Sequence, residues 1–370
     1  NAVDGRFVVM FKDNGDSRRG KGIVGTVASS GTGTTITWGT ETQHCSTYMQ
    51  SGSSGSDRKV QFDTKQGGGK FVFLFDTNIA NNEYPTVAQI GTVTGDGLAF
   101  GTISPHLGGT AGNNGPFRYG AFAFDPNNAG KFVVVWSDND NSGYGTLTIG
   151  TCDYSAGTIS WGTDYVFESS DIETESNKHG NAICFLKDQD KKFAIFYNKG
   201  NHYGYGRVCE YSGTTIDDIG TETVHTTQYR GCDWIMAEED PDSGGTIALI
   251  YHALDGEYLK LKLVTISGTT MTFATKIGCN ENQSGEATVG MNLEFYGDGS
   301  NKFIAAYQER QRSGGAVGNS GEVRAFVAGT GNISPAVSDN DALGDHGQGV
   351  RFTAVGTAET FKLTTAGLKL

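Results

Sequence analysis

Residues 130–169 read GKFVVVWSDNDNSGYGTLTIGTCDYSAGTISWGTDYVFES, and this stretch decides how the chain folds. It opens with an apolar run, passes through an Asn/Asp/Gly turn and enters a second run that contains Gly-Thr. A Ser-Ala-Gly turn then leads to ISWGT and a last apolar segment. Runs of β-branched and aromatic residues separated by such turns are typical of short antiparallel strands. The stretch therefore predicts strands and turns.

The same phrase recurs six times along the chain. The residues that hold the same place in each apolar run are Phe7, Phe71, Phe132, Phe193, Ile247 and Phe303. A repeat of more than fifty residues built from short strands indicates a radial or stacked β-repeat, because one unit cannot bury both faces of its own sheet.

Each copy also has a leading strand ahead of the apolar run, which makes four antiparallel strands a unit. The leading strands begin at Arg58, Arg118, Asn181, Cys232, Val289 and Val350. Four such strands repeated six times predict an all-β fold, a β-propeller of four-stranded antiparallel blades. The chain begins with a second strand and ends near the last leading strand. We therefore expect the N- and C-terminal strands to pair and close the ring without a free sheet edge.

The repeats predict a single β-propeller domain over residues 1–370. The repeats cover approximately residues 4–63, 64–125, 126–188, 189–240, 241–298 and 299–356, followed by a tail over 357–370. Phe361 in this tail is in register for another second strand. Six blades are the favoured count, and three alternatives for the tail stay open: an addition to the rim, a seventh blade, or a longer parent chain.

Composition excludes several classes of protein. The chain has 55 Gly among 370 residues, 19% charged residues and a formal net charge of -13. An acidic surface argues against nucleic-acid partners, since these need a dense basic surface. No stretch approaches the roughly 20 apolar residues that span a bilayer, so no membrane insertion is expected.

The six cysteines carry no CxxC pair, which argues against a zinc knuckle or a thioredoxin-type site. We expect free buried thiols and no cofactor. Cys152 and Cys209 align in CDYSAGTI and CEYSGTTI, so a bridge between neighbouring units stays open. A second set of recurring residues lies on the fourth strands, where we expect aromatic packing between blades: Trp38, Phe100, Trp161 and Phe273.

The long loops of the units are expected on one face of the propeller, which makes that face the candidate binding surface. Arginines at the entry of innermost strands would converge there, and a guanidinium can hold a carboxylate of an acidic sugar through two hydrogen bonds. The candidate ligand-binding residues are Arg58, Arg118, His179, Arg230, Tyr119 and Tyr229. The competing interpretation is that they are ordinary loop residues paired with nearby Asp and Glu.

No catalytic residues are assigned. A sialidase is disfavoured because the turns lack the aspartate-box pattern Ser-x-Asp-x-Gly with a trailing Trp. A polysaccharide lyase would place His179, Tyr119 or Tyr229 as a base beside an arginine. Asp138, Asp140 and Ser142 loosely echo a calcium loop, but the other repeats do not keep this spacing, which favours a solvated turn over a metal site.

The phrases GKFVVVWSDNDNSGYGTLTIGT and GTISWGTDYVFES resemble the repeat of tail-fibre and other virion proteins of marine phages, cyanophages among them, and of related bacterial extracellular proteins. The resemblance covers nearly the whole chain. It implies an extracellular or virion-borne propeller that binds surfaces or other structural subunits, and it carries no catalytic residues over.

We therefore expect a non-enzymatic β-propeller, extracellular or on a virion surface, that binds a host surface glycan or receptor or serves as a phage structural or decoration subunit. Its partners would be such a glycan or receptor, other virion or filament subunits, or further copies of itself. One alternative is a secreted bacterial or algal adhesin or filament protein. Another is a propeller carbohydrate-active enzyme, sialidase-like or a polysaccharide lyase.

Overall fold

The computed structural model describes most of the chain. The described residues are 5–30, 33–49, 59–77, 86–107, 117–172, 180–200, 203–227, 235–252, 259–275, 277–278, 289–296, 302–313, 316–328, 333–334, 350–353, 362–364 and 367–369. Within these ranges the regular structure is all strand except for one short 3-10 helix, Asn139–Asn141. None of the described helical residues forms a helix long and apolar enough to cross a membrane.

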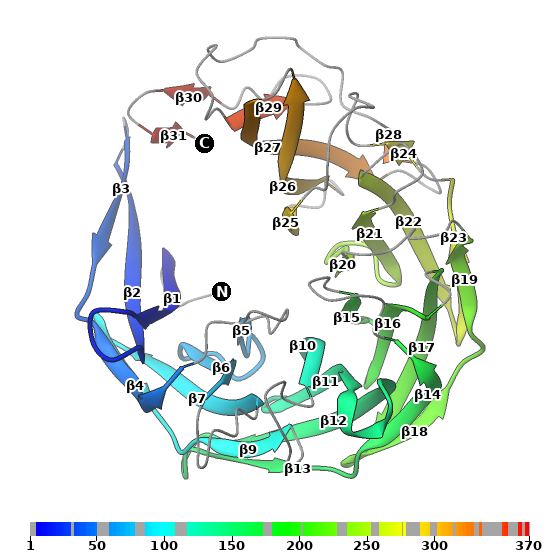
Figure 1. The fold of residues 1–370 in the computed structure, drawn as a ribbon, viewed down its shortest axis with the longest axis horizontal. Coiled ribbons are helices and arrows are strands. Elements are labelled where there is room, and N and C mark those ends of the chain that lie inside the picture. The colour runs from blue at the N-terminus through cyan, green and yellow to red at the C-terminus, as the bar shows by residue number, and fades with distance from the viewer. Residues whose placement is uncertain are drawn as a thin grey trace. The chain divides into compact units, whose positions relative to one another are not determined.

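Six sheets follow one another along the chain (Figure 1). The first three hold β1 (Arg6–Asp13), β2 (Arg19–Ser30), β3 (Gly33–Trp38) and β4 (Thr42–Tyr48); β5 (Lys59–Phe62), β6 (Lys70–Asp76), β7 (Thr86–Thr94), β8 (Gly97–Phe100) and β9 (Ser104–Leu107); and β10 (Phe117–Phe124), β11 (Lys131–Asp138), β12 (Tyr144–Asp153), β13 (Thr158–Trp161) and β14 (Tyr165–Asp171).

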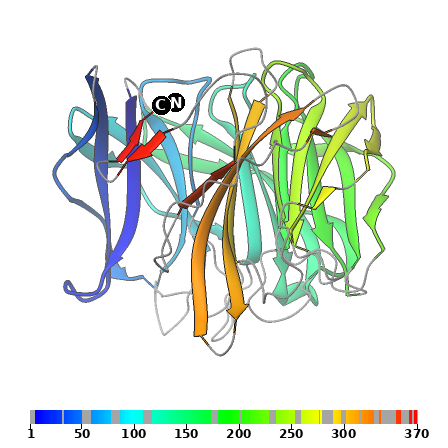
Figure 2. The same ribbon diagram turned by 90° about the horizontal axis from the view of Figure 1, so that it is seen from above.

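The next two sheets hold β15 (Asn181–Phe185), β16 (Lys192–Asn198), β17 (Gly204–Ser212), β18 (Thr215–Ile219) and β19 (Thr223–Thr226); and β20 (Ile235–Glu239), β21 (Thr246–His252), β22 (Leu259–Ser267), β23 (Thr270–Phe273) and β24 (Ile277–Gly278). The sixth holds β25 (Val289–Tyr296), β26 (Lys302–Ser313), β27 (Ala316–Ala328), β28 (Ile333–Ser334) and β29 (Val350–Thr353). In Figure 2, β26 and β27 are the long orange pair.

The second to sixth sheets share one strand order and the first lacks the leading strand, which confirms the predicted blades of a β-propeller. All described strand pairs within these sheets are antiparallel except β27 with β29. Neighbouring strands in the chain pair in sequence, as in β10-β11-β12-β13. The last strand of a blade is interrupted. In the third sheet β13 pairs with residues 150–153 of β12, and β14 pairs with residues 144–147 of the same strand. The tail adds β30 (Lys362–Thr364) and β31 (Gly367–Lys369), a two-stranded sheet and not a further blade.

The strand predicted to close the ring pairs elsewhere. Val350–Thr353, as β29, lies parallel to β27, and the described partner of β1 is β2. β28 pairs only with the end of β27, at Val327 and Ala328, which leaves an edge of β27 that β29 takes up. An open edge of backbone N–H and C=O groups attracts such a strand.

Contacts divide the chain into two compact units. The first comprises Asn1–His179, Tyr211–Asp217 and Leu363–Lys369, and the second comprises Gly180–Glu210, Asp218–Lys362 and Leu370. Each unit has its own buried apolar layers between successive sheets. The predicted single domain over residues 1–370 stays a prediction.

In the first three sheets the aligned phenylalanine packs over a glycine on the next strand. Phe71 pairs with Gly91, and Phe132 pairs with Gly150. A Cβ on either glycine would overlap the phenylalanine ring. The fourth-strand aromatic closes this contact from the side, with the Phe132 and Trp161 ring centroids 5.5 Å apart in an edge-on arrangement. The predicted packing between blades is seen for Phe100, Trp161 and Phe273. Trp38 contacts Phe7 of its own sheet but is 51% exposed.

The glycine of the TWGT phrase has a different role, at the joint between successive sheets. Thr102 N donates to Gly157 O at 2.8 Å, and a Cβ on Gly101 would overlap that same carbonyl. Gly39 meets Asp96 in the same way, and its neighbour Thr40 donates to Asp96 O at 3.2 Å. The broken fourth strand therefore turns its backbone towards the hairpin of the following sheet, and only glycine leaves room for the approach.

The alignment of Cys152 with Cys209 is wrong. Phe132 pairs with Gly150 and Phe193 pairs with Cys209, so Cys209 corresponds to Gly150. The hairpin that follows has four residues in the third sheet and two in the fourth, which shifts the CxYS motif by two positions. The four cysteines in the described part of the chain, the other two being Cys45 and Cys184, are free thiols.

Candidate functional site

Polar side chains of the third strands lie in the layers between sheets, where most serve packing. Gln89 of β7 is 3% exposed. Its Nε2 donates to Gly101 O at 2.9 Å and to His44 O at 3.2 Å. In the third sheet Thr148 takes this position and donates to Gly162 O at 3.5 Å. These groups satisfy the carbonyls that the broken fourth strand leaves open.

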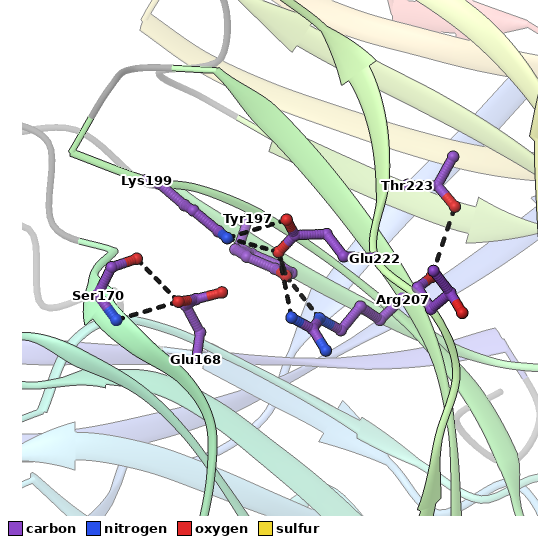
Figure 3. A network of polar contacts seen from close by, with 8 residues as sticks. Glu168, Ser170, Tyr197, Lys199, Arg207, Glu222 and Thr223 are labelled. Atoms are coloured by element: carbon purple, nitrogen blue, oxygen red, sulfur yellow. Dashed lines mark hydrogen bonds and ion pairs between the residues drawn. The ribbon is translucent and has the colours of Figure 1, made fainter.

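The fourth sheet places an arginine at that position and builds a polar cluster around it (Figure 3). Arg207 Nε donates to Tyr197 Oη at 2.8 Å, and Arg207 Nη2 lies 3.2 Å from Glu222 Oε2. Tyr197 Oη donates to the same Glu222 oxygen at 2.5 Å. Lys199 Nζ lies 2.7 Å from Oε2 and 2.9 Å from Oε1. We call Tyr197, Lys199, Arg207 and Glu222 the blade 4 cluster.

The cluster combines charge with aromatic surface and reaches solvent. The side chains of Lys199, Arg207 and Glu222 are 19%, 20% and 22% exposed. Lys199 Nζ also lies 4.5 Å from the centre of the Tyr205 ring, within the range of a cation–π contact. Burial, and then the hydrogen bond to Glu222, raise the pKa of Tyr197, so its hydroxyl stays protonated and acts as a donor.

Local sequence explains how the cluster assembles. Tyr197 and Lys199 stand at the end of β16 on the face of the sheet that also carries Arg207. Glu222 follows Gly220 by two residues in GTETVHT, a phrase that GTETQHC repeats around Glu41. Glu41 Oε2 likewise approaches a cation, Lys21 Nζ, at 3.5 Å. Glu222 was not singled out from the sequence, although the recurrence of GTET around Glu41 and Glu222 was a usable signal.

Most of the predicted ligand residues are not covered by the structure. Arg58, His179, Arg230 and Tyr229 lie outside the described residues. Arg118 and Tyr119 lie in β10, where Arg118 pairs with Ser137 on β11, and their side chains are also outside what is described. The funnel site therefore stays a prediction.

The calcium-like turn has a structural role in the described chain. Asp138 Oδ1 accepts Asp140 N at 3.2 Å and caps the short helix Asn139–Asn141, and Ser142 follows at φ 58°. Burial, together with the charges of Asp140 and Asp164, raises the pKa of Asp138. Among the described residues no group of three or more His, Cys, Asp or Glu side chains could hold a metal ion.

Two carboxyls of the innermost strand β20 have raised pKa values. Burial raises the pKa of Glu238 to about 8, with repulsion from Glu294 and Glu239 adding to it. Burial raises the pKa of Glu239 to about 7. Glu239 accepts the backbone N–H groups of Lys187 at 2.6 Å and Gly245 at 3.1 Å, so this carboxyl ties β20 to turns of the fourth and fifth sheets.

No protein-family model matches the chain, and no curated protein matches it in sequence. Among solved structures, a putative 6-phosphogluconolactonase from Bacteroides uniformis is similar over 89% of this chain and 81% of its own, with 12% identity and a TM-score of 0.52. The β-propeller domain of the Trilobed protease from Pyrococcus furiosus matches 76% of this chain and 85% of its own, with 10% identity and a TM-score of 0.34. A lectin from Aleuria aurantia bound to α-methyl-L-fucoside matches 75% of this chain and 79% of its own, with 12% identity and a TM-score of 0.38. At such identities a likeness concerns the fold alone.

Proposed function

We propose that the chain is a non-enzymatic β-propeller, displayed outside the cell or on a virion, that binds a surface glycan of a host. The observation that carries this proposal is the blade 4 cluster. It gathers a guanidinium, an ammonium and a phenol at the end of β16, beside the ring of Tyr205, and about a fifth of its charged side-chain surface meets solvent. Few convergent polar donors next to aromatic surface are typical of a small-ligand site.

Display on a virion or outside the cell rests on the resemblance of the repeat to marine phage tail-fibre and virion proteins and to bacterial extracellular proteins. The scaffold itself suits this setting, because glycine and phenylalanine positions hold the sheets together while cluster positions differ from blade to blade. A decoration subunit or a filament protein would use the same scaffold with a protein partner in place of a glycan.

Two strongly shifted groups other than Glu238 and Glu239 support the non-enzymatic part of the proposal. Burial lowers the pKa of His225 to about 3, with Lys262 adding to it, and its ring packs against Tyr251. Burial raises the pKa of Cys152 to about 12. These shifts follow from packing and leave neither group as a base or nucleophile near neutral pH.

The test is a glycan array and a polysaccharide pull-down with the whole chain, comparing wild type with Lys199→Ala. The matched control is Lys191→Asn. Lys191 stands before β16 and Lys199 stands after it, so the two variants each remove one positive charge from opposite ends of the same strand. Asn suits position 191, where φ is 60°.

We expect wild type and Lys191→Asn to bind the same glycans, and Lys199→Ala to bind them about tenfold more weakly, as the loss of one charge-assisted contact implies. Equal binding by all three proteins would overturn the site. Absence of binding to every glycan would overturn the function and favour a structural subunit, and release of soluble product would show an enzyme.

A further inference from the structure

The turn between β1 and β2 contains an Asn-Gly pair, Asn14 and Gly15. Strand pairing ends where Asp13 meets Arg19, so the pair lies beyond the last rung of the sheet. Both residues are exposed, and no hydrogen bond within the described chain holds the side chain of Asn14. The Asn14 amide can therefore rotate towards the backbone nitrogen of Gly15.

A carboxylate holds the backbone N–H that follows Asn14. Gly15 N donates to Asp13 Oδ1 at 2.8 Å. Asp13 Oδ2 accepts Lys21 Nζ at 2.6 Å, so the carboxylate is fixed between an ammonium and this amide. The hydrogen bond from Lys21, and then the one from Gly15, lower the pKa of Asp13 and keep the carboxylate ionised near neutral pH. A basic oxygen at this distance from an N–H is within reach of its proton.

Glycine at position 15 keeps this arrangement open. A Cβ on Gly15 would lie 3.2 Å from Asp13 Oδ1, which is a tight contact. A side chain there would also stand next to the nitrogen and crowd any bond between that nitrogen and Asn14 Cγ. The turn therefore brings together an unrestrained amide, an unshielded backbone nitrogen and a base.

We propose that Asn14 is a site of spontaneous deamidation in which Asp13 acts as the base. Asp13 Oδ1 takes the proton from Gly15 N, and this nitrogen forms a bond to Asn14 Cγ. The bond from Cγ to the side-chain NH2 breaks, and the NH2 group takes up the proton and leaves as ammonia. The resulting five-membered succinimide is opened by one water molecule to aspartate or isoaspartate at position 14. Asparagine and water give acid and ammonia, and nothing is oxidised or reduced.

The reaction changes the charge at one corner of the first sheet. It adds a carboxylate next to a group in which Lys21 Nζ already lies 2.6 Å from Asp13, 3.6 Å from Asp16 and 3.5 Å from Glu41. Isoaspartate also lengthens the backbone of the turn by one methylene. The turn thus becomes more acidic and longer as the protein ages, independently of glycan binding at the blade 4 cluster.

Incubation of the whole chain near neutral pH tests the site, with peptide mass spectrometry to locate the acid and enzymatic labelling to count isoaspartate. Asn141 is the internal control, because it is also exposed but precedes Ser142 and not glycine. We expect conversion at Asn14 to run well ahead of conversion at Asn141, and Gly15→Ala to suppress it. Equal rates at Asn14 and Asn141 would overturn the site.

Two substitutions around the carboxylate test the base. Asp13→Asn keeps an acceptor for Gly15 N but removes the base, and Lys21→Gln removes the ammonium but keeps the base. We expect several-fold slower conversion in Asp13→Asn, and conversion in Lys21→Gln at least as fast as in wild type. Equal slowing in both variants, or in neither, would overturn the role of Asp13.

Unfolding separates the folded geometry from the local sequence. In concentrated urea the hydrogen bond from Gly15 N to Asp13 is lost, so wild type and Asp13→Asn should convert at the same rate at Asn14. A slower rate for Asp13→Asn that persisted in urea would contradict the proposal, because the effect would then belong to the sequence and not to the turn.

Discussion

The third and fourth sheets put opposite charges on the same frame. By register, Trp136 and Asp138 of the third sheet correspond to Tyr197 and Lys199 of the fourth. Asp164 and Glu222 likewise follow the matched glycines Gly162 and Gly220 by two residues. In the third sheet the corner is acidic, with Asp140 and Asp164 acting on Asp138. In the fourth sheet a guanidinium and an ammonium surround one carboxylate.

The comparison teaches which positions of the repeat are structural and which are variable. Gly162 and Gly220 have the same backbone bond in both sheets, to Ile149 O at 2.9 Å and Val208 O at 2.8 Å. Both approach the following hairpin closely, at Thr214 and Thr269. The charged side chains beside these glycines can differ between the two sheets because they end at the solvent. Changing them leaves the shared backbone hydrogen bond intact.

The largest effect should come from substituting the glycine that both sheets place against the following hairpin, Gly162 in the third sheet and Gly220 in the fourth. A Cβ on Gly220 would lie 2.7 Å from Thr269 O, and one on Gly162 would lie closer still to Thr214 O. We expect Gly162→Ala to lower the free energy of unfolding by about 2–4 kcal/mol and Gly220→Ala by about 1–2 kcal/mol. Urea unfolding followed by circular dichroism measures both.

The control for the glycines is Ala274→Gly. Ala274 occupies the same place in the fifth sheet, with its N–H 2.9 Å from Leu263 O. This substitution should cost about 1 kcal/mol, because it adds backbone freedom and removes one methyl group that packs against the cluster between the fifth and sixth sheets. A loss at Gly162 no larger than this would show that the joint tolerates a side chain.

The next largest effect should come from neutralising Glu222, and it should exceed the effect of neutralising Asp164 at the matching position. In Glu222→Gln, Arg207 and Lys199 lose the charge that they share, which should lower the free energy of unfolding by about 1–3 kcal/mol. In Asp164→Asn, Asp138 loses a repelling neighbour, so stability should stay within about 0.5 kcal/mol of wild type. Equal losses in the two variants would contradict the assigned difference in charge.

A smaller effect is expected from the phenol of the blade 4 cluster. Tyr197→Phe removes the donor to Glu222 and the acceptor for Arg207 Nε while it keeps the ring that stacks on Tyr205. The expected loss is about 1 kcal/mol. Trp136→Phe tests the matching position of the third sheet. There the loss in the free energy of unfolding should follow the change in buried side-chain volume. Thermal unfolding in low and high salt separates the two, since only the first should depend on salt.

The smallest effect concerns pH. The folded pKa of Asp138 is raised, by burial first, above the ordinary value of 3.8. A carboxyl with a raised folded pKa contributes stability that is fully present below its unfolded pKa and is lost as pH rises through the folded pKa. Between about pH 3.8 and the folded pKa, the unfolding free energy of wild type should therefore fall with pH more steeply than that of Asp138→Asn. Identical slopes in acid titrations of the two proteins would contradict the shift.

The sequence predicted the blades because their signals are local. In β11, Phe132, Val134 and Trp136 lie on one face and alternate with residues of the other face, and Gly turns bound the strand. Both signals depend only on residues near one another in the chain. Two expectations failed. One depended on the length of a hairpin, and the other on which distant strand a segment pairs with. Cys209 was misaligned because the hairpin between β17 and β18 is two residues shorter than the one between β12 and β13. Val350–Thr353 pairs with the edge of β27 and not with β1.

The candidate site was not predicted, and the reason is physical. Tyr197, Arg207 and Glu222 come from three strands or their ends, and their types taken singly are ordinary for a polar repeat. The repeat GTETQHC and GTETVHT held a signal for the acidic residue. Nothing in the sequence showed that Lys199 and Arg207 would converge on the same oxygen atoms.

The amino-acid sequence alone determined the repeat, the strand order within a blade and the phenylalanine and aromatic positions that pack, because periodic burial is written into neighbouring residues. The tertiary structure alone decided why the TWGT glycine is needed and which corner carries positive charge. These features depend on contacts across sheets, such as Gly101 with Gly157, and pairing in space leaves no fixed spacing along a chain.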